Sequence, residues 1–416
     1  MRVKRLVLEN IGPFIEADMS FLPDDWQSTD KPPVTLITGE NGTGKSIILD
    51  AIRGSFGVAY TTLDRNIRRV TGTSTAHIDL YLNINNKELR MPSGNILDTR
   101  IEIRGPEPAK IAVLPSHIAE GKEYPNWIVD FWSSGTAANS YKIDVFRTPD
   151  HKNFLKDSLN GQKKASNITN LICHFDYLRD SRDLEERRMG ERLYNFIEKI
   201  VSVSLLDDGH FSHVARATYE PKVIQNGMIV GLANLSSGNA YLIQNLVGLL
   251  GKMYAVHFLR KTPLDELGKT PGLLLIDEAE NQLHPKWQKR FISSVLEIFP
   301  NLQIIATTHS PFIISSVPDA RLFVCKSMGD HCIVEDETAD YSNRPVDEIL
   351  MSPLFEATQP FNEEITNLIA EYQQSILTDN DDERAKLKKR LIELNPSYFS
   401  YLNIDELIPY VLKEKV

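Results

Sequence analysis

The stretch VTLITGENGTGKSIILDAI, from Val34 to Ile52, decides the fold. It begins as a short apolar run rich in β-branched residues, continues as a glycine-bearing loop, and ends in an amphipathic pattern typical of a helix. The loop has the GxxxxGK[ST] spacing, which starts at Gly39 and closes on Lys45 and Ser46. In a strand-loop-helix setting this spacing indicates a phosphate-binding loop.

The residue types explain how such a loop would bind a polyphosphate. Its small and flexible positions, Asn41, Gly42 and Gly44, let backbone N–H groups wrap around the phosphates, and the positive end of the following helix adds to the attraction. We expect Lys45 to supply a charge for the β- and γ-phosphates and the Ser46 hydroxyl to be a ligand for Mg²⁺. The alternative is a chance glycine turn before a helix.

A second buried strand is predicted from Gly272 to Ile276, and it ends in Asp277 and Glu278. A continuous apolar run is typical of a central strand covered on both faces. Carboxylates at the carboxyl end of such a strand lie where ligands bind in open α/β sheets. We expect Asp277 to hold Mg²⁺, directly or through water, and Glu278 to orient and deprotonate the attacking water. A strand that simply stops at an acidic turn is the alternative.

Two further polar turns accompany these motifs. Ser236 and Gly238 lie directly before a helix that begins near Ala240, and a serine-glycine turn at a helix N-terminus attracts anions. His309 follows the next apolar strand, where a histidine can sense a γ-phosphate or the water attacking it. Each signal is weak alone, and a histidine in such a place is more often a satisfied loop histidine.

Composition limits the class of protein. The 416 residues can hold one large α/β domain with insertions, or two domains. The chain has 46 Lys and Arg against 56 Asp and Glu, a net charge of -10, so there is no bulk attraction to DNA or anionic lipid. The N-terminus lacks the apolar core of a signal peptide, and polar residues interrupt the apolar stretch from Tyr241 to Leu259, which predicts a buried helix and no membrane span. Three scattered cysteines point to a reducing cytoplasm.

Periodicity predicts the remaining elements. Alternating residues predict strands at 2–9, 77–84, 87–91, 303–307, 321–325 and 331–335, with a turn at Asn85-Asn86. We also expect a buried strand at 169–175 and a helix at 184–206, whose charged face fits solvated ion pairs better than a DNA-binding ridge. Residues 105–167, rich in proline and aromatic residues, predict an irregular insertion without recognisable chemistry. Two apolar stripes near the C-terminus predict helices that either dock a partner or cap the domain.

The four motifs in this order resemble the pattern of ABC-type ATPases: phosphate loop, signature loop, acidic strand end and switch histidine. The sequences MRVKRLVLENIGPF and ITGENGTGKS are similar to those of SMC and RecF proteins, more than to transporter subunits. The sequences DEAENQLHPKWQ, THSPFIISS and VDEIL resemble OLD-like bacterial ATPases, many of them encoded in anti-phage defence operons. The resemblance covers roughly residues 1–60 and 230–350 and hardly touches the insertion.

This resemblance implies an α/β fold, an ABC-type P-loop ATPase head with an antiparallel β subdomain, an irregular insertion, a helical lid and a C-terminal helical tail. The implied ATPase domain is 1–342, with the insertion at about 105–167 and a helical subdomain at about 180–260, followed by a helical region at 343–416. ATP and Mg²⁺ are the implied cofactors.

The resemblance also implies how the site residues divide between two chains. The residues expected to serve the nucleotide bound in cis are Lys45, Ser46, Asp277, Glu278 and His309. Ser236 and Gly238 would close over the γ-phosphate held by a second copy, so that two nucleotides lie between two chains. The sequence departs from the pattern in two places, since no Q-loop glutamine can be assigned and Asn239-Ala240 replaces the usual polar pair. Both departures imply slow hydrolysis.

The remaining question is which target such an ATPase serves. The interval between the phosphate loop and the signature loop is too short and too rich in proline for a long coiled coil, which excludes an SMC arm. Asp379 and Asp381 lie in a polar turn and do not resemble a TOPRIM site, and no His/Asn set resembles an HNH site. We therefore expect a separate nuclease partner, either a PtuB-like HNH nuclease, as for PtuA-like ATPases of Septu and retron systems, or a TOPRIM nuclease, as for AriA-like ATPases. The alternative is a RecF- or SMC-like repair ATPase that binds nucleic acid without such a partner.

Overall fold

The protein is described from a computed structural model. The described residues are 1–23, 26–27, 30–56, 76–84, 87–95, 102–103, 124–135, 141–143, 145–156, 158–161, 165–205, 209–355, 361–378 and 380–400. The chain divides into two compact units, Met1–Val346 and Asp347–Val416. The predicted turn at 85–86, Asp379, and the parts of the expected insertion at 104–123 and 136–140 lie outside the described residues.

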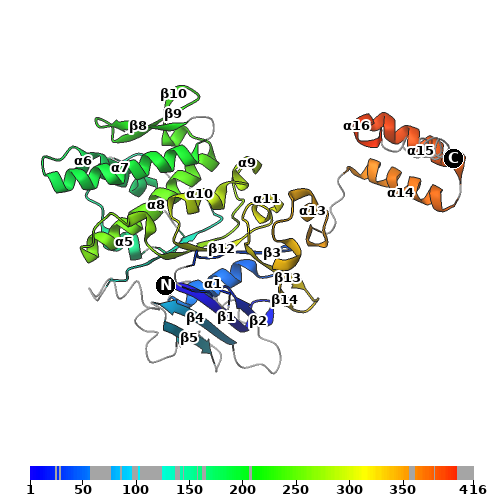
Figure 1. Cartoon of the computed structure of the whole chain (residues 1–416), viewed down its shortest axis with the longest axis horizontal. Helices are drawn as coiled ribbons and strands as arrows, with labels where there is room; N and C mark the ends of the chain where they lie inside the picture. The colour runs from blue at the N-terminus through cyan, green and yellow to red at the C-terminus, as the bar shows by residue number, and fades with distance from the viewer. Residues whose placement is uncertain are drawn as a thin grey trace, which may run out of the picture. The chain divides into compact units, whose positions relative to one another are not determined.

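A large mixed sheet forms the centre of the first unit (Figure 1), with the strand order β6-β5-β4-β1-β2-β14-β13-β3-β12-β11-β7. Its strands are β1 (Arg2–Ile11), β2 (Phe14–Ser20), β3 (Val34–Gly39), β4 (Ala76–Ile84), β5 (Lys87–Asn95), β6 (Glu102–Ile103), β7 (Ile128–Trp132), β11 (Gly272–Ile276), β12 (Leu302–Thr307), β13 (Arg321–Ser327) and β14 (Cys332–Asp336). Strands β13, β3, β12, β11 and β7 run parallel to one another. Strand β1 pairs antiparallel with β2 and β4, as does β4 with β5.

The central parallel strands form the core because β11 and β12 are apolar along most of their length. Every residue of β11 and β12 is buried, as expected for strands covered on both faces. Gln303 is a polar exception on β12, and its side chain accepts from the Val3 N–H at 2.7 Å and donates to the Val3 carbonyl at 2.8 Å. This pair satisfies the buried amide and ties the first strand of the chain to the parallel core.

Helices and a second, smaller sheet complete the first unit. The helices are α1 (Lys45–Ser55), α5 (His151–Lys156), α6 (Ala165–Arg179), α7 (Leu184–Ser204), α8 (Ser237–Arg260), α9 (Pro285–Gln288), α10 (Phe291–Ile298), α11 (Pro311–Ile314) and α12 (Thr338–Tyr341), with 3₁₀ turns at Leu232–Asn234 and Leu267–Lys269. The small antiparallel sheet contains β8 (His210–Ala215), β9 (Glu220–Gln225) and β10 (Met228–Gly231). Figure 1 shows α5 to α8 gathered beside this small sheet, in what we call the helical layer.

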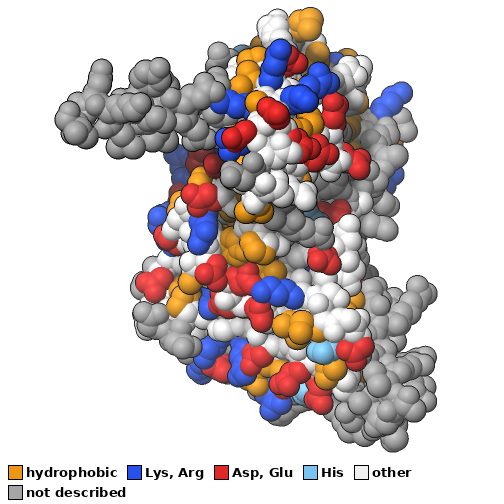
Figure 2. Space-filling model, turned by 90° about the vertical axis from the view of Figure 1, so that its right-hand side faces the viewer, with side chains coloured by type: hydrophobic (Ala, Val, Ile, Leu, Met, Phe, Trp, Pro, Cys, Tyr) orange, Lys and Arg blue, Asp and Glu red, His pale blue; other side chains and the backbone are white. Residues whose placement is uncertain are grey.

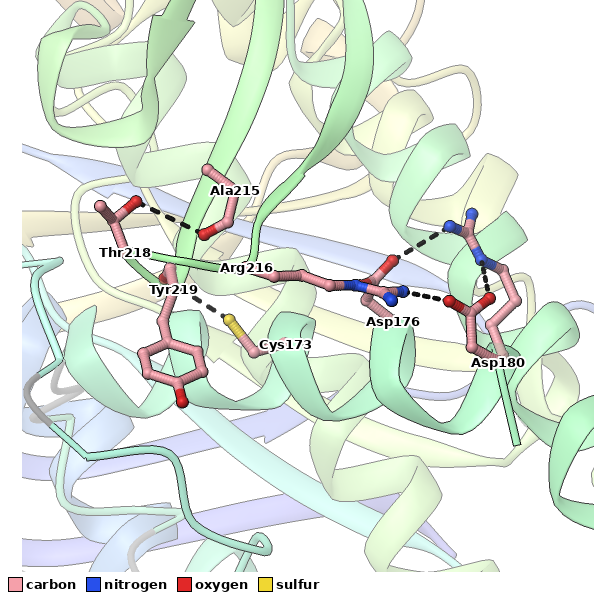
Figure 3. A network of polar contacts seen from close by, with 8 residues as sticks. Cys173, Asp176, Asp180, Ala215, Arg216, Thr218 and Tyr219 are labelled. Atoms are coloured by element: carbon pink, nitrogen blue, oxygen red, sulfur yellow. Dashed lines mark hydrogen bonds and ion pairs between the residues drawn. The ribbon is translucent and has the colours of Figure 1, made fainter. Parts of the chain in front are cut away.

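Charged side chains fasten the small sheet to the helical layer. Arg216, just after β8, reaches across to α6, where its Nε donates to the buried Asp176 at 3.0 Å and its other end pairs with Asp180 (Figure 3). Nearby, the Cys173 thiol donates to the Tyr219 carbonyl at 3.5 Å. The small sheet is therefore held to α6 by side chains from both.

Helix α13 (Val346–Leu350) begins at the boundary between the units, and the second unit further contains a 3₁₀ turn at Pro353–Phe355 and the helices α14 (Glu363–Leu377), α15 (Asp381–Leu394) and α16 (Pro396–Phe399). Tyr372, Leu391 and Phe399 form a cluster of buried residues in it, and both predicted apolar stripes contribute to this core. Ile376, on the first stripe, is instead 48% exposed. The tail is thus helical as predicted, around a small core.

Most predicted elements are confirmed, and two are wrong. The segment at 169–175, expected as a strand, lies within α6, where residues on all sides of the helix are buried and the helical period is hidden. The expected insertion at 105–167 is not wholly irregular, because Ile128–Trp132 forms the edge strand β7 of the parallel core. In the described part of the chain one helix, α8, is long and apolar enough to cross a membrane, and it is mostly buried inside the fold, as predicted.

Candidate nucleotide site

The predicted phosphate loop connects β3 to α1, as the sequence indicates. Gly44 precedes the first turn of α1 with a φ of +94°, a conformation that favours glycine. A Cβ atom at Gly44 would lie 2.7 Å from the ring of Phe14, so the space also excludes a larger residue. Asn41 and Gly42 are exposed at the turn of the loop. The loop therefore presents backbone N–H groups at the N-terminus of an 11-residue helix.

Lys45 is folded back onto this loop. Its Nζ donates to the carbonyl oxygens of Gly39 at 3.0 Å and Glu40 at 2.6 Å, and the residue is 8% exposed. Burial lowers the pKa of Lys45, while the carboxylates near it, Glu280 foremost, oppose that effect. The ammonium group thus lies at the mouth of the loop, held by weak backbone acceptors that a phosphate could replace.

Asp277 is the point where the ends of three elements meet. Its Oδ1 accepts a hydrogen bond from the Ser46 hydroxyl at 2.9 Å and another from the Thr307 hydroxyl at 2.7 Å. Ser46 is in the first turn of α1, Asp277 follows β11, and Thr307 ends β12. The two residues predicted to bind Mg²⁺, separated by 231 positions in the sequence, are therefore in direct contact.

Glu278 is held in an unusual backbone conformation beside this contact. It has a φ of +53°, which is uncommon for a residue other than glycine, and its N–H donates to the Thr307 hydroxyl at 2.8 Å. The side chain is exposed. Burial of part of the carboxyl group, followed by the charges of Asp277 and Glu280, raises the pKa of Glu278. A carboxylate with a raised pKa at this edge is suited to accept a proton.

His309 lies on the same edge, in the turn after β12. Burial, and then the positive charge of Lys45, lowers the pKa of His309, so the imidazole is neutral near pH 7. The N–H of the preceding residue, Thr308, donates to the Ile37 carbonyl at 3.0 Å, which places this turn beside β3, the strand that leads into the phosphate loop. The sequence-predicted residues Lys45, Ser46, Asp277, Glu278 and His309 thus gather at one edge of the parallel sheet.

Glu280 was missed by the sequence analysis and supports this turn. Its two carboxylate oxygens accept hydrogen bonds from the His309 N–H at 2.7 Å and from the Thr308 hydroxyl at 2.6 Å. Glu280 therefore fixes the backbone from which the His309 side chain extends. An acidic residue two positions after Glu278 was the available signal, but its partner on the neighbouring strand end is visible only in the fold.

The serine turn, Ser236 to Gly238, begins α8. The Ser236 hydroxyl accepts from the Asn239 N–H at 3.4 Å as the helix cap. Gly238 is buried, and a Cβ atom there would lie 2.7 Å from the Gln282 carbonyl oxygen. Packing within its own chain therefore explains why this position is a glycine. Among the described residues, no hydrogen bond or ion pair joins Ser236 or Gly238 to the phosphate loop.

Strand β7 borders the site on the side of β11. The Asp277 N–H donates to the Trp132 carbonyl at 2.9 Å, and the Asn281 side chain donates to the Ser134 carbonyl. No glutamine occurs in the sequence between Trp132 and Gly161.

The surface offers little support for binding nucleic acid on the face drawn in Figure 2. Acidic and basic side chains are interleaved there, with no continuous basic field among the described residues. Such interleaving agrees with the net charge of -10 and gives no single-sign potential to attract a phosphate backbone.

The chain is similar in sequence to curated relatives, among them the following two. The chain is 26% identical over 316 residues to "Septu protein PtuA" of Bacillus thuringiensis, which covers 76% of this chain and 73% of that protein. It is 23% identical over 251 residues to "Retron Vc95 probable ATPase" of Vibrio cholerae serotype O1 biovar El Tor, covering 59% of this chain and 46% of that protein. The chain thus spans less than half the length of the retron ATPase.

The fold is similar to that of an SMC head. The structure titled "Crystal structure of the SmcHead bound to the C-winged helix domain of ScpA" aligns with a TM-score of 0.50 and 16% identity, over 82% of this chain and 99% of that chain. This confirms the predicted fold class. A family model described as "AAA domain, putative AbiEii toxin, Type IV TA system" matches residues 34–315, well over half of the chain, and the chain belongs to that family.

Proposed function

We propose that this chain binds ATP with Mg²⁺ and hydrolyses it slowly, as the ATPase subunit of a cytoplasmic anti-phage defence complex. The observation that carries the proposal is the contact between the Ser46 hydroxyl and Asp277, 2.9 Å apart at the mouth of the phosphate loop. The similarity to a Septu protein and a retron ATPase supports the defence context.

The residues present fit a magnesium ion bound together with a nucleotide. Mg²⁺ prefers oxygen ligands and is commonly held by one or two protein groups plus phosphates and water. Ser46 and Asp277 supply one hydroxyl and one carboxylate in contact, and no group of three His, Cys, Asp or Glu residues among those described could hold a metal by itself. When bound, Mg²⁺ would neutralise charge on the phosphates.

The proposed hydrolysis uses the residues around this point. Lys45 would exchange its backbone carbonyl partners for the β- and γ-phosphates. Glu278, whose pKa is raised, would take a proton from the attacking water, and the neutral His309 would donate a hydrogen bond to the γ-phosphate or accept one from that water. Thr307 and Glu280 hold the backbone from which these two groups extend.

The proposed site is completed by a second copy of the chain. The serine turn is a capped helix N-terminus, suited to an anion, yet it makes no hydrogen bond or ion pair with the phosphate loop among the described residues. The serine turn of each copy could cover the nucleotide held by the phosphate loop of the other copy. Nucleotide occupancy would then control association, and through it a partner nuclease of the HNH or TOPRIM class.

Replacement of Glu278 by Gln tests the assignment of the base. Glu278→Gln keeps the shape of the side chain but removes the proton acceptor, so we expect ATP hydrolysis to fall ~10² to 10⁴-fold while ATP binding is kept. Lys45→Ala, as the control, should instead abolish nucleotide binding. Steady-state phosphate release measures hydrolysis, and equilibrium binding of a fluorescent ATP analogue measures nucleotide binding. Normal hydrolysis by Glu278→Gln would show that another group is the base.

Replacement of Glu280 by Ala tests whether this residue orients His309. The change removes two acceptors from the turn after β12, so we expect kcat to fall by about 10 to 10²-fold with little change in ATP affinity. Glu297→Ala is a matched control, because Glu297 is an exposed acid whose ion pair with Lys199 lies on the surface. An unchanged kcat for Glu280→Ala would contradict the orienting role.

Replacement of Ser236 by Arg tests completion of the site by a second copy. A long charged side chain at the serine turn should block association without touching the phosphate loop of its own chain. We expect Mg²⁺-ATP to increase the mass of Glu278→Gln in solution, measured by light scattering, and to leave the mass of Ser236→Arg/Glu278→Gln unchanged. Ser236→Ala in the same background controls for loss of the helix cap. If ATP binding to the double variant is lost as well, Ser236 acts within its own chain.

Co-purification tests the partner. We expect a tagged chain, expressed with its neighbouring genes, to retain the product of one of them, and that product to have nuclease motifs. Binding should persist in high salt if it depends on packed surfaces, and should change with Mg²⁺-ATP. If the chain retains no such product and instead binds DNA alone, in an ATP-dependent and salt-sensitive manner, the RecF-like alternative is correct.

A further inference from the structure

A buried ion pair connects the helix of the serine turn to the sheet that carries the phosphate site. Lys252, in the second half of α8, contacts Asp130 in the middle of β7, with 2.5 Å between Nζ and Oδ1. The Lys252 side chain is 5% exposed and that of Asp130 0%. Burying two charges has a large desolvation cost, so such a pair is weak evidence for stability and calls for another explanation.

Asp130 is bound at several points to the strand that ends beside the site. Its Oδ1 accepts from the Phe131 N–H at 2.9 Å and its Oδ2 accepts from the Trp132 indole N–H, also at 2.9 Å. The Trp132 carbonyl in turn accepts from the N–H of Asp277. A short chain of hydrogen bonds and covalent bonds therefore leads from Lys252 to the carboxylate proposed to hold Mg²⁺.

Helix α8 meets β7 at a second point, one turn after the serine turn. The ring of Tyr241 packs edge-on against Trp132, with ring centres 6.3 Å apart. Tyr241 and Lys252 are 11 residues apart, which is about three helical turns, so both side chains leave the same face of α8. Asp130 and Trp132 are two residues apart and share one face of β7. Two contacts separated along the helix fix both its direction and its rotation.

The other end of this connection is the turn that follows Glu278. The Asn281 side chain donates to the Ser134 carbonyl just after β7, and the Gln282 carbonyl lies against Gly238 in the serine turn. The serine turn is therefore held from two sides, by the turn after the carboxylates and by the helix that β7 holds.

From this arrangement we infer that Asp130 and Lys252 are positioning residues for the nucleotide site. The pair fixes the orientation of α8 relative to β7, so that the serine turn points where the nucleotide of a second copy can be covered. This role rests on the proposed function, because it matters only if the serine turn completes a nucleotide site. Neither residue contacts the phosphate loop in the hydrogen bonds and ion pairs of the described residues, so neither is catalytic.

The test separates positioning from a merely structural role by removing one or both charges. Lys252→Met or Asp130→Asn alone leaves one buried charge unpaired, so both single variants should have a lowered Tm. Asp130→Asn/Lys252→Met removes both charges while the introduced amide keeps an acceptor for the Trp132 indole, and this variant should regain most of the Tm. We nevertheless expect about a 10²-fold loss of hydrolysis and loss of Mg²⁺-ATP-dependent association, with ATP binding retained.

A second ion pair with a buried carboxylate provides the matched control. Asp176 and Arg216 join the small sheet to α6 and do not involve α8 or β7 (Figure 3). Asp176→Asn/Arg216→Met should hydrolyse ATP at the rate of the unchanged protein. If Asp130→Asn/Lys252→Met is as active and as able to associate as this control, the positioning role is wrong. If that double variant does not fold, Lys252→Arg takes its place, because it keeps the positive charge but changes the length of the side chain. A normal kcat and a normal Tm of Lys252→Arg would equally overturn the positioning role.

One measurement distinguishes failure of this inference from failure of the proposed function. If Glu278→Gln does not associate with Mg²⁺-ATP, the proposed two-chain site is wrong, whatever the pair does. Amide hydrogen exchange in the first turn of α8 then reports coupling within one chain. In the Ser236→Arg variant, Mg²⁺-ATP should change the rate of amide hydrogen exchange in the first turn of α8. Adding Asp130→Asn/Lys252→Met to that variant should remove this effect of Mg²⁺-ATP. An equal response with and without the pair overturns the inference.

Discussion

The Asp277 carboxylate is the constraint on which the site depends. One of its oxygens accepts hydrogen bonds from both Ser46 and Thr307, so the start of α1 and the carboxyl ends of β11 and β12 lie at the same place. Parallel strands bring their carboxyl ends to one edge, and β3, β12 and β11 are neighbours in the sheet. Strand order therefore brings the phosphate loop, the Asp277 carboxylate and the turn that carries His309 to one edge of the sheet. The antiparallel strands and the helical layer do not contribute to this contact.

The two turns beside this edge are each supported within the chain. Thr307 and Glu280 restrain the backbone of Glu278 and His309, so these side chains extend from a fixed frame. The serine turn has its own support, since Gly238 packs on the Gln282 carbonyl. The short segment from Asp277 to Gln282 therefore connects the carboxylates to the serine turn, and a change in the position of one would be felt by the other.

The sequence was sufficient for those parts in which local pattern and fold agree. The phosphate loop and β11 have clear patterns, and Ser46 and Asp277, the two residues predicted to hold Mg²⁺, are hydrogen-bonded to each other. The error at 169–175 has a local cause, because residues 171–176 of α6 are all buried, so the helical period is hidden in this segment. Strand β7 was missed for a tertiary reason. Asp130 interrupts its apolar run, and the lysine that compensates this charge is 122 residues away.

The helices of the helical layer would move together with α8, because they are packed against it and joined to one another. Helices α5, α6 and α7 pack on α8, and Arg216 ties the small sheet to α6. Helix α8 is buried along most of its length, so it cannot shift alone without exposing apolar surface. Any displacement of the serine turn must therefore involve the whole layer, with β7 and the segment after Glu278 as the points of attachment. A molecule that binds anywhere on the layer and moves it would change the position of the serine turn, and this is the physical requirement for a trigger to act on a nucleotide site that it does not touch.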